Sequence, residues 1–134
     1  MRFLLLKLFV VVSFLSYAQD ERISSLDFVQ ILDGNVEEAM FYYQNNWEQL
    51  RLMALDSGYI QSYELLETSF DDNAPFHLIL LTTYANQEQF DRREDNFGAL
   101  IAVKGELQLL NEKKPNEFRK VIFWKEPVNH LNQN

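Results

Sequence analysis

The sequence predicts an α+β domain in which two helices cover one face of a four-stranded antiparallel sheet. Several short segments have strand-like apolar patterns, and one long segment has apolar residues at helical spacing. These segments follow one another as strand, helix, strand, strand, helix, strand. That order is the split β-α-β arrangement of the ferredoxin-like fold, which places both helices on the same face of the sheet.

The N-terminal segment has the three parts of a secretory signal peptide. Arg2 supplies a positive charge, an apolar stretch covers 3–15, and small residues lead up to Ala18. The apolar stretch is shorter than the roughly twenty residues of a membrane-spanning helix, which makes an uncleaved anchor the less favoured alternative. We therefore expect residues 1–18 to be removed. Residues 19–134 then form one exported domain, periplasmic or secreted, without membrane association after cleavage.

Charge and cysteine content exclude several classes of protein. The formal charge is −8, and loss of Arg2 and Lys7 with the leader changes it to −10. Nucleic acids and anionic membranes are bound through clustered Lys and Arg, so we expect neither as a partner. The chain has no cysteine, which excludes disulfides, a lipid-anchored cysteine and thiolate metal ligands.

The exported part begins with a short polar lead at 19–25 and a predicted strand at 26–32. The apolar residues of this strand lie on both of its sides, and Asp33-Gly34-Asn35 has the composition of a turn that ends it. The strand contains no histidine.

The first helix is predicted over 36–56. Its apolar residues recur every three or four positions, as on one face of an α-helix. These residues are Val36, Met40, Tyr43, Trp47, Leu50 and Ala54. Asn35 and Glu38 match a variant of the capping box at its start, and Gly58 is suited to end it.

Two further strands are predicted, at 59–68 and 76–84, on either side of a polar acidic connection at 69–75. The segment 76–84 is apolar on both faces, which is typical of a central strand. The acidic connection lacks the oxygen spacing of a calcium loop, so we expect a solvated turn and no metal site.

The C-terminal part contains the second helix and the last strand. Asn86 and Gln89 again match a capping pattern, so this helix should begin near Gln87. Its predicted buried face consists of Phe90, Phe97, Leu100 and Ile101. The remaining elements are predicted as a short helical piece at 103–111, a polar loop at 113–116, a strand at 118–124 and a frayed tail at 127–134.

Three stretches together resemble the dimeric α+β barrel superfamily, which includes stress-responsive barrel domains, NIPSNAP-like domains and small monooxygenases. They are WEQLRLMALDSGYIQSYELLE, LILLTTYANQEQFDRREDNF and FRKVIFW. The resemblance implies a homodimer in which two sheets close around a shared interior. It implies no single activity, because the superfamily ranges from oxygenases and haem-handling enzymes to proteins without known chemistry.

Five residues are candidates for lining a ligand pocket. His77 is predicted either as a general base or axial haem ligand, or as a strand-end imidazole hydrogen-bonded to a neighbour. Trp47 and Tyr63 either line a site for a flat apolar ligand or pack in the core and dimer interface. Arg119 on the last strand needs a partner if it faces inward, and Glu64 or a bound anion would supply one. His130 is expected to be solvated in the tail.

The leading interpretation is an exported homodimer that binds a small hydrophobic ligand or acts as a stress-related accessory protein, without catalysis and without a cofactor. One alternative is a cofactor-independent monooxygenase or haem-handling enzyme with His77 and Arg119 in its cavity. A second alternative is a structural interaction module.

Overall fold

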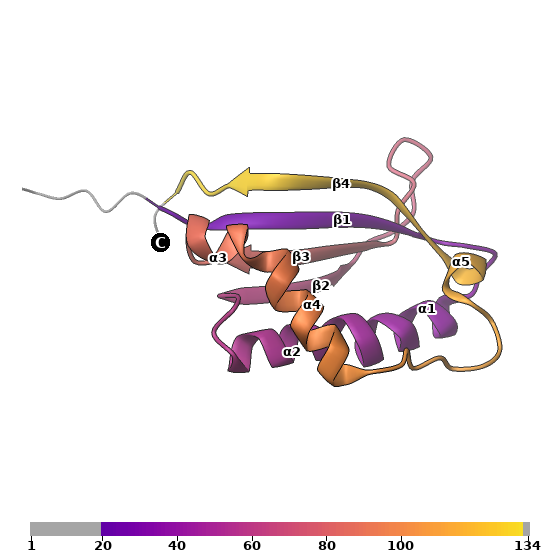
Figure 1. The fold of residues 1–134 in the computed structure, drawn as a ribbon. Helices are drawn as coiled ribbons and strands as arrows, with labels where there is room; N and C mark the ends of the chain where they lie inside the picture. Colours follow the sequence, from indigo (N-terminus) through magenta and orange to yellow (C-terminus); the bar gives the residue numbers. More distant parts are fainter. Residues whose placement is uncertain (1–19, 133–134) are drawn as a thin grey trace, which may run out of the picture.

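The computed structural model describes residues 20–132, so the predicted signal peptide lies outside the described part of the chain. Four antiparallel strands form one sheet in the order β2-β3-β1-β4 (Figure 1). The strands are β1 (Ile23–Ile31), β2 (Ser62–Glu67), β3 (Leu78–Tyr84) and β4 (Arg119–Asn129). The predicted central position of the third strand is confirmed, since β3 pairs with both β2 and β1.

The longer helices cover one face of this sheet (Figure 1). The helical elements are α1 (Val36–Tyr42), the π-helix η1 (Tyr43–Trp47), α2 (Glu48–Asp56), α3 (Gln87–Asp91), α4 (Arg93–Lys104) and α5 (Pro115–Phe118). The predicted α+β class is confirmed, and the arrangement fits a ferredoxin-like fold. Among residues 20–132, no helix has the length and apolar character needed to cross a membrane.

The core lies between the sheet and the helices and has two parts. One consists of Val29, Ile31, Ala39, Tyr43, Leu78, Leu80 and Phe118. The other consists of Ile23, Ala54, Ile60, Tyr84, Phe90 and Leu100. Each part joins buried strand residues to helix residues, so burial of apolar surface holds the helices on the sheet.

The first strand begins earlier than predicted. The segment 19–25 was expected to be a polar lead, but β1 starts at Ile23 and pairs there with both Tyr84 of β3 and Asn129 of β4. The Ser24 hydroxyl is hydrogen-bonded to the Thr83 hydroxyl at 2.8 Å. Cross-strand partners therefore let polar residues lie within a central strand.

The first helix runs continuously from Val36 to Asp56, as predicted, but its middle turn is π-helical. The predicted capping box is wrong. The Asn35 side chain makes no cap bond, and its Nδ2 instead donates to the Leu32 carbonyl at 2.9 Å. Gly58 has φ +71°, the left-handed conformation that glycine readily adopts after a helix.

The second helix begins as predicted, because the Asn86 side chain accepts a hydrogen bond from the Gln89 amide at 2.9 Å. It is interrupted at Arg92, which separates α3 from α4. Phe90 and Leu100 are buried as expected. Ile101 is 53% exposed and therefore does not belong to the buried face.

Three predicted C-terminal elements are wrong. No separate helix forms at 103–111, because α4 extends to Lys104 and ends there, and Gly105 turns the chain with φ +82°. The segment 105–114, called the strap below, passes irregularly along the helices. The predicted loop at 113–116 contains the start of α5, and the predicted tail contains the end of β4, which pairs with β1 as far as Asn129.

The face of the sheet away from the helices carries an aromatic cluster. Phe28 stacks on Phe123, with ring centroids 4.5 Å apart, and meets the edge of Phe76 at 5.0 Å. Since Val29 packs in the core under the helices, the alternation of side chains places Phe28 on the opposite face. Phe123 is 43% exposed.

Candidate functional site

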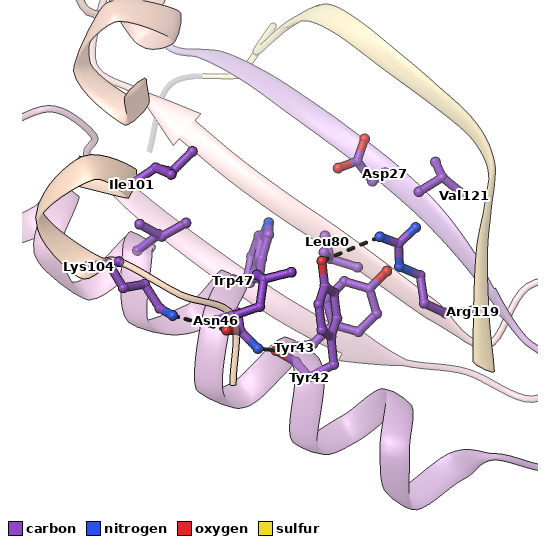
Figure 2. Close-up of a pocket in the computed structure, with 13 residues that line it drawn as sticks. Asp27, Tyr42, Tyr43, Asn46, Trp47, Leu80, Ile101, Lys104, Arg119 and Val121 are labelled. Atoms are coloured by element: carbon purple, nitrogen blue, oxygen red, sulfur yellow. Dashed lines mark hydrogen bonds between the residues drawn. The ribbon is translucent and has the colours of Figure 1, made fainter. Parts of the chain in front are cut away.

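A cavity of about 310 Å³ lies between the helix-facing side of the sheet and the first helix (Figure 2). Its apolar walls include Leu50, Leu80, Ile101, Leu107 and Val121. Its aromatic and polar lining includes Asp27, Tyr42, Tyr43, Asn46, Trp47 and Arg119. Such a mainly apolar cavity with a few polar groups is typical of a small-molecule site.

The π-helical turn η1 supplies a large part of the lining. Tyr43, Asn46 and Trp47 all belong to this turn and all line the cavity. A π-helical turn accommodates an extra residue within an α-helix, and such turns are frequently found at functional sites. Here the turn brings three large side chains of different chemistry to the same wall.

Asn46 connects this turn to the strap. Its side chain is buried; Nδ2 donates to the carbonyl oxygens of Tyr42 at 2.9 Å and Gln108 at 2.8 Å. Its Oδ1 accepts hydrogen bonds from the Gln108 amide at 2.7 Å and from Lys104 Nζ at 3.0 Å. Asn46 thus holds the strap against the cavity, which Gly105 and Leu107 help to line.

Arg119 extends from the first residue of β4 into the cavity (Figure 2). Its Nη2 donates a long hydrogen bond of 3.4 Å to the Tyr42 hydroxyl, and its Cζ lies 5.2 Å from the Tyr42 ring centroid. Within residues 20–132, its buried Nε has no hydrogen-bond partner, and the same holds for the buried Nε1 of Trp47.

Asp27 lies on β1 and faces the same cavity (Figure 2). Burial raises the pKa of its carboxyl group, and the repulsion of Glu126 acts in the same direction. The positive charges of Arg51 and Arg119 act in the opposite sense and lower that pKa. Within residues 20–132, the Asp27 carboxylate forms neither a hydrogen bond nor an ion pair, so it has free acceptor capacity toward the cavity.

Arg51 lies behind the aromatic wall of the cavity. Its guanidinium carbon is 4.5 Å from the Trp47 ring centroid and 4.4 Å from that of Phe97. Its Nε donates to the Thr82 hydroxyl at 3.1 Å. Burial lowers the pKa of Arg51 to about 10, so the group remains protonated at neutral pH.

Two of the five candidate residues named from the sequence, Trp47 and Arg119, line the cavity together. Tyr63 packs edge-on against Trp47, with ring centroids 5.7 Å apart, and supports the wall from behind. Glu64 is exposed, and strand alternation directs it away from the core side that Tyr63 occupies. Arg119 therefore contacts Tyr42 and not Glu64.

The two histidines lie outside the cavity lining. His77 Nδ1 accepts a hydrogen bond from the Ile31 amide at 2.9 Å, and its ring lies 5.2 Å from that of Phe70. This is the structural arrangement that the sequence left as one alternative. His130 was expected to be solvated, but its Nε2 is hydrogen-bonded to the Ser24 hydroxyl at 2.7 Å, which ties the end of the chain to β1.

Sequence reasoning missed Asp27 and Asn46. A signal for Asp27 was available, because an acidic residue occupies a position that alternates with the core residue Val29. Asn46 gave no such signal, since its contacts are made to the distant strap. The described residues contain no group of three or more His, Asp or Glu side chains suited to a metal ion.

Comparison with known proteins adds little to this geometry. No protein-family profile matches the chain, and no curated protein matches it. Among solved structures, the chain is similar to HapK from Hahella chejuensis, with 14% identity and a TM-score of 0.48. That similarity covers 84% of this chain and 98% of HapK.

Proposed function

We propose that this protein binds a small, flat, largely apolar molecule in the cavity under the first helix. The observation that carries the proposal is the mainly apolar cavity itself, two of whose lining residues, Arg119 and Trp47, have buried Nε and Nε1 donors without an acceptor among residues 20–132. A buried polar group without a hydrogen bond costs about 1–3 kcal/mol. A ligand that brings an oxygen atom within reach of either donor, after a small side-chain adjustment, would recover that free energy, while its apolar body fills the cavity.

The proposal includes a homodimer of the dimeric α+β barrel type. The support is the cluster of Phe28, Phe76 and Phe123 on the sheet face that the helices leave uncovered. In such a dimer two of these faces pack together, and the ligand cavity on the other side of each sheet stays accessible. A purely structural role would use the same face and leave the cavity without a ligand.

A cofactor-independent monooxygenase is the second candidate, and Asp27 is the observation that favours it. A carboxylate with a raised pKa in an apolar cavity can act as a general base, and Arg119 could stabilise the resulting substrate anion. A haem ligated by histidine does not fit this cavity, because His77 and His130 both engage groups elsewhere.

Ligand binding in the cavity can be tested with a substitution whose larger side chain fills the cavity. Leu107 lines the cavity, so Leu107→Trp should remove most of the space for a flat ligand. Val103, on the same part of the chain, is 77% exposed, and Val103→Trp is the matched control. The measurement is calorimetric titration with 2-methoxynaphthalene as the flat apolar probe.

We expect the wild type and Val103→Trp to bind this probe and Leu107→Trp to bind it at least tenfold more weakly. Equal binding by all three proteins would place the probe outside the cavity and contradict the proposal. Native mass spectrometry of the protein from its own host would report subunit number and any retained ligand together.

A further inference from the structure

We propose that the ligand carries an acidic hydroxyl group, of the phenol or enol type, which Asp27 and Arg119 recognise jointly. This inference rests on the ligand-binding function proposed above and narrows the class of ligand. It starts from two oppositely charged side chains that line one cavity without pairing with each other.

The pairing of β1 with β4 places both groups beside the same cavity without an ion pair between them. Arg119 pairs with Ile31 across β4 and β1, and Asp27 lies four residues earlier on β1. Four strand residues span roughly 13 Å, of which the extended arginine side chain covers a part. Figure 2 shows the guanidinium group reaching toward Asp27 and stopping short of it. The positive charge of Arg119 nevertheless acts to lower the pKa of Asp27, against the effect of burial.

Hydrogen-bonding capacity determines which group fits between them. An ionised carboxylate only accepts hydrogen bonds and a guanidinium only donates them. A hydroxyl does both, so its O–H can donate to Asp27 while its oxygen accepts from Arg119 Nε. A carboxylate ligand could use only Arg119 and would be repelled by Asp27. An ether or ketone would leave Asp27 without a partner.

The other side chains that line the cavity indicate the shape and polarity of the rest of the ligand. Tyr43 and Trp47 supply aromatic surface to the cavity, and Leu80 and Val121 supply aliphatic surface. A planar apolar ring fits against such surfaces, and its hydroxyl would then lie between Asp27 and Arg119. The structure therefore points to a hydroxylated aromatic compound or a planar enol of similar shape.

The test compares 2-naphthol with its methyl ether, 2-methoxynaphthalene, by calorimetric titration at neutral pH. The two probes share the flat ring and the acceptor oxygen and differ in the O–H donor. A hydrogen bond to a charged group contributes about 1.5–3 kcal/mol, which corresponds to about a tenfold to hundredfold difference in affinity. We expect the wild type to prefer 2-naphthol by that factor.

Substitutions at Asp27 test whether this residue causes the preference for 2-naphthol over its methyl ether. Asp27→Leu should reduce the preference for 2-naphthol over its methyl ether to near one. Asp27→Asn, which keeps the shape and an acceptor oxygen, should reduce the preference without abolishing it. Glu64→Gln, which removes an exposed carboxylate from β2, is the matched control and should retain the full preference.

The outcomes separate this inference from the proposal on which it rests. If the wild type binds both probes equally, or if Asp27→Leu keeps the preference, the hydroxyl assignment is overturned and the ligand cavity stands. If neither probe binds, the proposed binding function itself fails. The comparison of the two probes on the wild type decides the first question even if a variant does not fold.

Discussion

At the scale of single residues, the charged groups beside the cavity are held by burial and weak contacts. Among residues 20–132, Asp27 has no hydrogen bond or ion pair, and Arg51 contacts two aromatic rings and one hydroxyl. In this part of the chain, the Arg119 guanidinium forms only a long hydrogen bond to Tyr42. Groups arranged in this way add little to folding stability, because desolvation opposes their mutual attraction. Their placement is more readily explained by a ligand that completes their hydrogen bonds.

The pKa of Asp27 predicts how this residue affects stability. A carboxyl whose pKa is raised by folding stabilises the fold below its ordinary value of 3.8, and that contribution is lost as the pH rises through the raised value. Asp27→Asn, which resembles the protonated form, should therefore be more stable than the wild type at pH 7 and equal to it near pH 3.

Denaturant unfolding at the two pH values measures this difference. The control is Glu64→Gln, an exposed position at which no such pH-dependent gain is expected. A loss of stability in Asp27→Asn at pH 7 would show that the ionised carboxylate is favourably paired in the folded protein.

Arg51 and Asp27 should be coupled through charge. Arg51→Met keeps much of the apolar contact with Trp47 and Phe97 but removes the positive charge that favours ionised Asp27. At neutral pH this change should cost more in the wild type than in Asp27→Asn. A double-mutant cycle should give a favourable coupling within the range of about 0.5–3 kcal/mol that is usual for interacting neighbours. Additive effects would show that the two groups do not interact.

At the scale of elements, the π-helical turn and the strap form one unit. The turn presents Asn46 to the strap, and the strap in turn closes the end of the cavity through Gly105 and Leu107. If 36–56 were a regular α-helix, the side chains after this turn would point in a different direction relative to those before it. The local departure from α-helical geometry thus has a consequence for the shape of the cavity.

The contribution of this unit can be measured with two adjacent asparagines. Asn46→Ala removes hydrogen bonds to Tyr42, Gln108 and Lys104 and should lower the free energy of unfolding by about 1–3 kcal/mol. Asn45→Ala removes one bond to the Phe41 carbonyl and should cost less than about 1 kcal/mol. Hydrogen exchange should show faster exchange of the Gln108 amide only in Asn46→Ala. Equal exchange in both variants would contradict the anchoring role.

At the scale of the whole molecule, the two faces of the sheet have different roles. The helices and the cavity occupy one face, and the cluster of Phe28, Phe76 and Phe123 occupies the other. A group of aromatic side chains on a sheet face without helices is typical of an interface between subunits. The homodimer proposed above would bury this face and leave both cavities intact.

Two adjacent residues of β4 test the dimer. Phe123→Lys places a charge in the aromatic cluster and should give a monomer in sizing chromatography where the wild type is a dimer. Trp124 is 61% exposed and, by strand alternation, points to the other side, so Trp124→Lys should leave the dimer unchanged. A wild-type monomer would contradict the dimer, and dissociation by both variants would contradict its assignment to this face.

Export is a separate prediction about the whole chain. Cleavage after Ala18 should give a mature protein that begins at Gln19 and carries a formal charge of −10, two units below the −8 of the full chain because Arg2 and Lys7 are lost. N-terminal sequencing of the protein from its host measures this directly. A chain that retains Arg2 would contradict cleavage.

The parts of the fold predicted correctly from sequence have local causes. The apolar residues on both faces of 76–84 indicated a central strand, and Asn86 before Gln89 indicated the start of the second helix. The errors arose where distant contacts override local preference. The start of β1 and the end of β4 are strands because each pairs with the other, although both segments are polar.

The candidate site was predicted only in part for the same reason. Trp47 and Arg119 were recognised because an aromatic residue on a helix face and an arginine in a strand are conspicuous in isolation. Trp47 and Arg119 line the same cavity as Asp27 because β1 pairs with β4 and because the first helix contains the π-helical turn. Glu64 was an incorrect partner for Arg119 because the direction of its side chain follows from sheet register.

The amino-acid sequence by itself determined the α+β class, the order of the elements, the long first helix and the acidic charge. These properties depend on composition and on periodicities of a few residues, which act within one segment. Only the tertiary structure decided the strand boundaries, the π-helical turn, the strap held by Asn46, and the cavity that joins Asp27 to Arg119. Those features depend on hydrogen bonds and burial between residues far apart in the chain, and no local pattern encodes such contacts.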